Sequence, residues 1–293
     1  MKNKDIFTFR DAEKQAGPVA FSTMLKPAGS ACNLDCHYCY YLDKAVQYGG
    51  RQAVMSDELL ELYVKQYIEA NEVPTVQFCW HGGEPLLLGV DFYRKAMDFQ
   101  QKYADGKKIE NILQTNGTLV DEAWCDLFAG NNFLVGISLD GPQDIHDAFR
   151  LTKGGRPTFE RVMRTIEMFQ RSGVEYNTLS VVNRLCEGRG GEIYRFFRDT
   201  VHSRYMQFLP AVEHVVDKPG FHRPLIVSPD REGARLAEWS VTAKGYGGFL
   251  CDVFDVWVVS DVGRTFVQMF DATLAQWCGC LLYTSPSPRD STS

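Results

Sequence analysis

Residues Ser22–Cys39 read STMLKPAGSACNLDCHYC, and this stretch decides both the fold and the chemistry. It begins with a short apolar run, Ser22–Lys26, whose composition predicts a β-strand. A Pro-Ala-Gly turn follows, and the loop after it carries Cys32, Cys36 and Cys39 in a C-x3-C-x2-C arrangement. Loops that follow the strands build the active site in β/α barrels, so the sequence predicts a site at the end of this first strand.

The same alternation of a strand-like run and an amphipathic segment repeats along the chain. The predicted strands are Ser22–Lys26, Thr75–Trp80, Ile109–Gln114, Phe133–Leu139, Tyr176–Val182 and Tyr205–Leu209. The predicted helices between them are Ser56–Ala70, Asp91–Tyr103, Asp121–Phe128, Thr158–Arg171 and Glu192–Asp199. Such an alternation implies parallel βα units with right-handed crossovers. Because it stops after six strands, we expect an α/β fold with a partial, TIM-like (β/α)6 barrel.

After Pro210 the pattern changes. A predicted loop, Asp217–Pro229, leads into two helical stretches, Ser240–Ser260 and Thr265–Trp277. We therefore expect four parts: a lead-in over 1–20, a core barrel over 21–235, connecting helices over 236–279 and a tail over 280–293. The tail has no periodicity and is rich in Ser and Pro, which fits a flexible end. We favour the interpretation that it is a translated sequencing adapter and not natural protein.

The composition excludes several classes of protein. The chain has 293 residues, 45% of them hydrophobic, with a net charge of −6 and no Lys/Arg block. These values indicate a globular protein without a nucleic-acid-binding surface. No apolar run approaches the roughly 18 residues of a membrane span, and the N-terminus resembles no signal peptide. The nine cysteines are an odd number, so we expect reduced thiols or metal ligands in a cytoplasmic protein.

The three clustered cysteines allow two kinds of metal centre. A structural zinc site needs four ligands, and His37 is the nearest candidate for the fourth. Its position directly beside Cys36 makes convergence of both side chains on one ion difficult. A cubane iron–sulfur cluster held by three cysteines leaves one iron open to a substrate or cofactor. We favour the cluster over zinc.

The pattern resembles that of radical S-adenosylmethionine (SAM) enzymes. Cys32, Cys36, Tyr38 and Cys39 carry the resemblance, together with Gly82-Gly83-Glu84-Pro85 one βα unit later. It implies a [4Fe-4S] cluster whose open iron chelates the amino and carboxylate groups of SAM. One electron then cleaves the sulfonium bond and gives a 5′-deoxyadenosyl radical, chemistry that belongs to the cofactor and not to the protein.

Within that family the chain is most similar to anaerobic sulfatase-maturating enzymes of the SPASM type. The similarity covers residues 20–277 and includes the stretches FCWHGGEP, LQTNGT and FLVGISLDGPQDIH, which begin at Phe78, Leu113 and Phe133. It implies oxidation of a Cys or Ser on a sulfatase polypeptide to Cα-formylglycine. It also implies a flavodoxin or ferredoxin as electron donor.

The resemblance assigns roles to individual residues. The implied cluster ligands are Cys32, Cys36 and Cys39. The implied SAM contacts are Tyr38, Gly82, Gly83, Glu84, Ser138, Arg150 and Val212. Ser138 offers a hydroxyl to a ribose, and Arg150 offers a fork to a carboxylate, but a strand-end cap and a surface ion pair are the structural alternatives for them. His81 and Gln207 are expected to face the substrate cavity.

The chain departs from this family at its C-terminal end. The cysteine-rich auxiliary domain with two further clusters, and the aspartate that serves as base, are not visible. Cys251-Asp252 resembles the context of that base, but we interpret Asp252 as a solvated helix residue. We therefore expect cofactor binding without sulfatase maturation, and an exposed apolar face over Val256–Trp277. The alternatives are another radical SAM peptide-modifying maturase and, more remotely, a zinc- or cluster-stabilised binding module.

Overall fold

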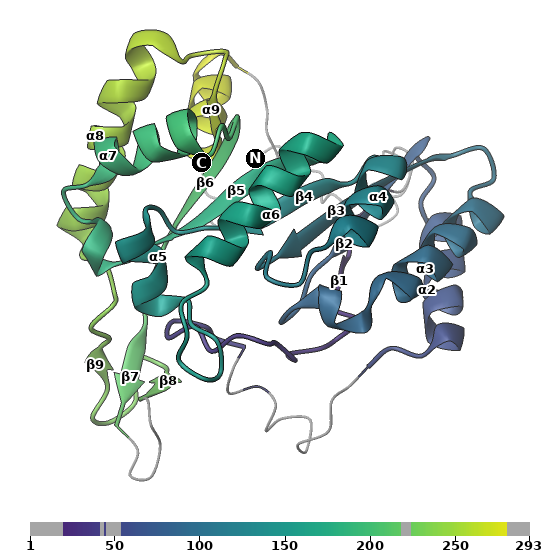
Figure 1. Ribbon diagram of the computed structural model, residues 1–293, viewed down its shortest axis with the longest axis horizontal. Coiled ribbons are helices and arrows are strands. Elements are labelled where there is room, and N and C mark those ends of the chain that lie inside the picture. Colours follow the sequence, from purple (N-terminus) through teal and green to yellow (C-terminus); the bar gives the residue numbers. More distant parts are fainter. Residues whose placement is uncertain (1–19, 42–43, 45–53, 218–223, 280–293) are drawn as a thin grey trace, which may run out of the picture.

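A central parallel sheet organises the computed structural model, which describes residues 20–41, 44, 54–217 and 224–279. The sheet has seven strands in the order β1-β2-β3-β4-β5-β6-β10, and every neighbouring pair is parallel (Figure 1). The strands are β1 (Met24–Leu25), β2 (Thr75–Trp80), β3 (Lys108–Thr115), β4 (Leu134–Ser138), β5 (Glu175–Val182), β6 (Tyr205–Pro210) and β10 (Phe266–Val267). In the described chain β1 and β10 form the two edges, so the sheet stays open. The predicted partial α/β barrel is confirmed.

The larger helices follow the strands as the sequence predicts. The helical elements are α2 (Asp57–Ala70), η2 (Pro85–Leu88), α3 (Val90–Tyr103), α4 (Glu122–Gly130), α5 (Gln143–Phe149), α6 (Phe159–Ser172), η3 (Arg184–Cys186), α7 (Gly190–Arg195), η4 (Phe196–Thr200), α8 (Ala243–Ser260) and α9 (Gln268–Trp277). Ser56 caps α2 by accepting a hydrogen bond from the Leu59 amide at 3.3 Å. Gly173, with φ of 69°, ends α6 in the left-handed conformation that glycine adopts without strain.

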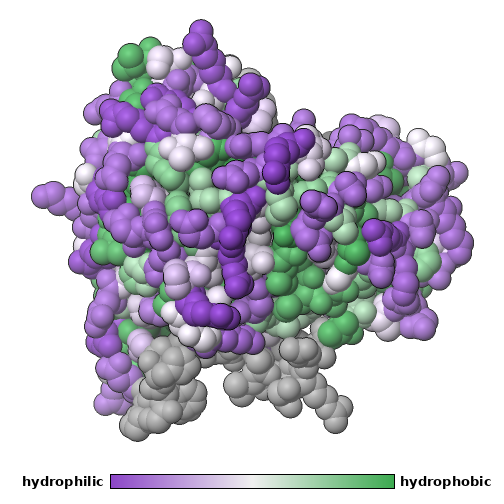
Figure 2. Space-filling view, in the orientation of Figure 1, coloured by the Kyte–Doolittle hydropathy of each residue, from purple (hydrophilic) through white to green (hydrophobic). Residues whose placement is uncertain are grey.

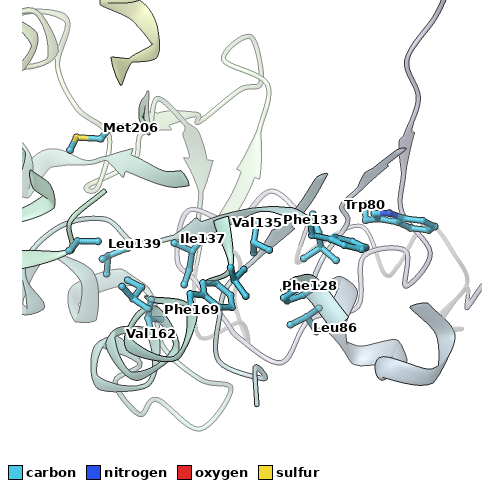
Figure 3. Close-up of a cluster of buried hydrophobic side chains, with 14 of the residues drawn as sticks. Trp80, Leu86, Phe128, Phe133, Val135, Ile137, Leu139, Val162, Phe169 and Met206 are labelled. Carbon is cyan, nitrogen blue, oxygen red and sulfur yellow. The ribbon is translucent and has the colours of Figure 1, made fainter. Parts of the chain in front are cut away.

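A hydrophobic core fills the space between the sheet and the helices that cover it. Figure 3 shows side chains from β2, η2, α4, β4 and α6 in contact there, among them Trp80, Phe128 and Phe169. The stripe predicted on α6 is buried at Val162, Ile166 and Phe169, which are at most 1% exposed. Burying each such side chain contributes roughly 1.5–3 kcal/mol, so this layer fixes how the strands lie and where their ends meet.

Several elements differ from the sequence prediction. Leu225–Val227, inside the predicted loop Asp217–Pro229, is strand β8 of a small antiparallel sheet with β7 (His214–Val216) and β9 (Arg235–Leu236). This sheet lies at the lower left of Figure 1, away from the main sheet. Helix α5 was not predicted, and β10 precedes the last helix as a seventh strand beside β6. These elements span seven residues or fewer, which is too short to show a hydrophobic period.

The C-terminal helices carry the apolar surface that the sequence predicts. Phe254, Val258, Leu274 and Trp277 line a groove of about 500 Å³ between α8 and α9, and Trp277 is 86% exposed. On the face shown in Figure 2, hydrophilic residues predominate elsewhere. No helix in the described part of the chain is long and apolar enough to span a bilayer. The lead-in over 1–19 and the tail over 280–293 lie outside the described residues.

Candidate functional site

The loops at the carboxyl ends of the strands surround a cavity of about 360 Å³. In a parallel sheet these ends share one edge, where ligands of α/β proteins bind. The predicted site residues that line the cavity are Cys32, Cys36, Tyr38, Cys39, His81, Gly82, Gly83, Ser138 and Arg150. They come from the ends of four different strands, so the fold brings together most of the residues that the sequence singled out.

The cysteines do not converge on a single point. In the described part of the chain no group of three His, Cys, Asp or Glu side chains is placed to hold one metal ion. His37, the candidate fourth zinc ligand, packs edge-on against Phe149 with ring centroids 5.9 Å apart and does not line the cavity. A cubane places each cysteine on a separate iron, so its ligands need not meet at one ion. The donor set therefore fits a cluster better than zinc.

Burial keeps these thiols protonated in the metal-free chain. Burial raises the pKa of Cys32 to about 11 and that of Cys36 to about 12. Metal binding requires thiolates and therefore releases protons from such groups. The remaining lone cysteines are not all buried, as we had expected. Cys125 and Cys186 are buried, but Cys251 is exposed.

The glycine pair after β2 packs directly on the cysteine loop. The amide of Gly83 donates to the Gly29 carbonyl at 3.0 Å, and the Glu84 amide donates to the Ala31 carbonyl at 2.7 Å. A Cβ at Gly83 would overlap the Ala31 carbonyl oxygen, and Gly82 has a φ of 131° that other residues rarely adopt. Glycine is thus required here by the close approach of two backbones at the cavity wall.

Glu84 lies behind this wall and does not line the cavity. Its fully buried carboxyl group accepts hydrogen bonds from the Leu86 amide at 3.1 Å, the Thr115 hydroxyl at 2.8 Å and the Asn116 amide at 2.8 Å. The group therefore ties the end of β2 to the end of β3. Burial raises its pKa from 4.5 to about 7, although the three donors act in the opposite direction.

We expect Glu84→Gln to destabilise the protein more at pH 5 than at pH 8. Because the folded-state pKa is raised, the stabilisation that Glu84 provides is complete below about pH 4.5 and is lost as pH rises through about 7. The shift corresponds to about 3 kcal/mol at most, and Gln does not titrate. Urea denaturation of both proteins at the two pH values measures the difference, and an equal cost at both contradicts the assignment.

Arg150 and Asp140 form a buried ion pair at the cavity. Arg150 Nη2 lies 3.0 Å from Asp140 Oδ1, and the two side chains are 8% and 0% exposed. The Tyr38 hydroxyl donates to the other Asp140 oxygen, and the Tyr38 ring lies beneath the guanidinium, 5.5 Å from Cζ to centroid. Arg150 Nε is buried and has no hydrogen-bond partner among the described residues. The surface ion pair considered as an alternative is therefore a buried one, with one donor left for a ligand.

The other predicted site residues lie in different surroundings. Ser138 Oγ accepts a hydrogen bond from Gln114 Nε2 at 3.1 Å at the end of β4. Gln207 lines a neighbouring cavity of about 910 Å³, and Val212 is 55% exposed and lines neither cavity. Asp252 is half-buried against Gly190, so its description as a fully solvated helix residue is wrong.

Sequence reasoning missed several buried polar residues that hold the cavity wall together. Asp140 is one, and His146 is another. The His146 ring accepts from the Asp140 amide at 3.4 Å and contacts the Thr158 hydroxyl at 3.0 Å. Burial lowers the pKa of His146 to about 4, so its ring is neutral at pH 7. Asn116 is a third. The quoted stretches LQTNGT and LDGPQDIH contained the signal, because each sets a polar residue directly after a strand.

An open parallel α/β sheet with three cysteines and a glycine wall around one cavity defines a class of enzyme that binds a metal cluster and an organic cofactor. Residues 27–186 match the Radical SAM superfamily. The chain therefore belongs to the radical SAM superfamily.

Known relatives extend this similarity along most of the chain. The chain is 47% identical to a serine-type anaerobic sulfatase-maturating enzyme of Bacteroides thetaiotaomicron, over 87% of this chain and 62% of that protein. It is 36% identical to a cysteine-type enzyme of Clostridium novyi, over 87% of this chain and 65% of that protein. The solved structure of anSMEcpe with bound AdoMet and the Cp18Cys peptide matches with a TM-score of 0.75 and 33% identity. It covers 91% of this chain and 67% of that one. The chain thus spans about three-fifths of the length of these curated relatives.

Proposed function

We propose that this chain is the radical SAM part of an anaerobic sulfatase-maturating enzyme, which oxidises a Cys or Ser of a sulfatase polypeptide to Cα-formylglycine. The observation that carries the proposal is the cavity in which three cysteines, a glycine wall and the free Nε of Arg150 face one another. The 47% identity to a serine-type maturating enzyme supports the reaction. Both serine-type and cysteine-type relatives match, so the target residue is left as either.

The cavity fits the cofactors of this family. Cys32, Cys36 and Cys39 would hold a [4Fe-4S] cluster, which when bound supplies the electron that cleaves SAM. Arg150 offers its free N–H to a carboxylate, and Asp140 keeps the guanidinium in place. The backbone at Gly82 and Gly83 offers polar groups at the wall. Ser138, with its hydroxyl at the end of β4, is the ribose contact in this proposal.

The remaining predicted residues complete the site. Tyr38 holds Asp140, and Glu84 fixes the glycine wall from behind. Val212 follows Ala211, which lines the cavity, so Val212 would contribute through its backbone. His81 lies at the cavity and accepts from the Gly82 amide, and it is the candidate for substrate contact. Gln207 would contact the substrate from the adjoining cavity.

The partners follow from the same proposal. A sulfatase polypeptide is the substrate, which is supported by the peptide present in the structure of anSMEcpe. A flavodoxin- or ferredoxin-type protein supplies electrons, and a reducing cytoplasm suits the free thiols. The base and two auxiliary clusters would belong to the part of the relatives' length that this chain does not match. We therefore propose that the chain binds the first cluster and SAM but does not complete maturation.

The test uses the anaerobically reconstituted chain with a chemical reductant. We expect absorption near roughly 400 nm from iron–sulfur charge transfer and production of 5′-deoxyadenosine from SAM. Sulfatase peptides with Cys or Ser at the target position should stay unmodified with this chain and gain formylglycine with a full-length gene product. A peptide with Ala at that position is the control. Absence of 5′-deoxyadenosine contradicts the proposal, and formylglycine formation by this chain contradicts the missing base.

A further inference from the structure

Asn116 connects the end of β3 to the cysteine loop. It follows directly after β3 and is 8% exposed. Its Nδ2 lies 3.7 Å from Cys32 Sγ and 2.9 Å from Asn33 Oδ1, so both N–H bonds of the amide point toward the cysteine loop. The Leu34 amide donates to the same sulfur at 3.4 Å. Cys32 Sγ therefore receives one donor from its own loop and one from a different strand.

The orientation of the Asn116 amide is fixed by its neighbours. The backbone N–H of Thr118 lies 2.9 Å from Asn116 Oδ1, and a backbone N–H can only donate. The Thr118 hydroxyl donates to the same oxygen at 2.7 Å and accepts from Asn33 Nδ2 at 2.8 Å. The atom that faces Thr118 must therefore be the carbonyl oxygen, and the NH₂ group must face the sulfur.

The backbone of Asn116 is held as well. Its N–H donates to Glu84 Oε2 at 2.8 Å, and this carboxyl group is fully buried. The side chain is thus anchored at both ends before any cofactor binds. Such pre-oriented outer partners tune metal sites, because hydrogen bonds to a ligand sulfur offset the negative charge that increases on reduction.

We propose that Asn116 is a positioning residue that holds Cys32 by an N–H···S hydrogen bond and raises the reduction potential of the cluster. The inference rests on the proposed function, since it takes Cys32 as a cluster ligand. The electron that reduces the cluster comes from the external donor protein. Asn116 neither gains nor loses a proton in this role and only changes how readily the electron is accepted.

The experiment compares cluster potentials in three variants of the full chain, reconstituted without oxygen. Asn116→Asp keeps an oxygen for the two Thr118 donors and removes both N–H groups. Asn116→Ala removes the N–H groups without adding charge. Thr118→Val removes the hydroxyl that contacts Asn116 and Asn33 but leaves the bond to Cys32. The readouts are iron content, circular dichroism and the midpoint potential from a redox titration followed by electron paramagnetic resonance.

We expect Asn116→Asp and Asn116→Ala both to shift the potential to more negative values, while Thr118→Val keeps that of the parent chain. A normal fold with lost iron in the two Asn116 variants, beside full iron in Thr118→Val, also supports the role in holding Cys32. A parental potential in Asn116→Ala overturns the proposal, because any shift in Asn116→Asp is then an effect of charge. Equal changes in Thr118→Val overturn it as well, since the turn and not the sulfur bond is then responsible. A parent chain without iron refutes the proposed function itself.

Discussion

Cys36→Ala should lose its bound iron and its absorption near roughly 400 nm after anaerobic reconstitution. Cys36 is 8% exposed and lines the cavity together with Cys32 and Cys39. Two remaining cysteines leave two corners of a cubane without protein ligands, so we expect iron to fall to background. Colorimetric iron analysis and an absorption spectrum measure this. Production of 5′-deoxyadenosine should disappear with the iron.

The matched control is Cys251→Ala. Cys251 is exposed on α8 and does not line the cavity, so its replacement should leave iron content unchanged. The same substitution is thus made at a thiol inside the site and at one outside it. If Cys36→Ala keeps the iron of the parent chain, the cluster assignment is wrong and the proposed reaction falls with it.

Asp140→Asn should lower the free energy of unfolding by about 3–5 kcal/mol, the usual cost of removing one partner from a buried ion pair. The pair with Arg150 is 3.0 Å long, and the Asp140 side chain has no exposed surface. Asn keeps the shape but leaves the guanidinium charge without its counter-ion. Asp140 Oδ1 also accepts from the Val181 amide at 2.9 Å, so the loop after β4 loses a second anchor. Urea denaturation under anaerobic conditions measures the loss.

An exposed ion pair provides the control for this prediction. Asp144 pairs with Arg189 at 2.6 Å, and its side chain is 62% exposed. Solvent screens such a pair, so Asp144→Asn should cost about 1 kcal/mol or less. A similar, small cost in both variants would show that water reaches Arg150 and that Asp140 is not needed to keep it in place. A large cost confined to Asp140→Asn supports the view that this ion pair holds the cavity wall.

The sequence alone predicted the parts of the fold that depend on period and punctuation. The α6 stripe and the strand Thr75–Trp80 were found with correct or nearly correct bounds, because apolar residues repeat at the period of each element. The short β8 and β10 were not found. Strands of two or three residues carry no period, and β10 exists only because Phe266 pairs with Tyr205 on β6.

The site divides in the same way. Cys32, Cys36 and Cys39 were found from the sequence because metal ligands on one loop keep a fixed spacing, and Gly82-Gly83 stood out through composition. Asp140 and Asn116 were not assigned, since their partners lie 10 Å or less away in space but tens of residues away in the chain: Tyr38 donates to Asp140 across 102 positions, and Asn116 contacts Cys32 across 84. Ligand identity is thus local information, whereas the charge and hydrogen bonds around a ligand arise only when the strand ends meet at one edge of the sheet.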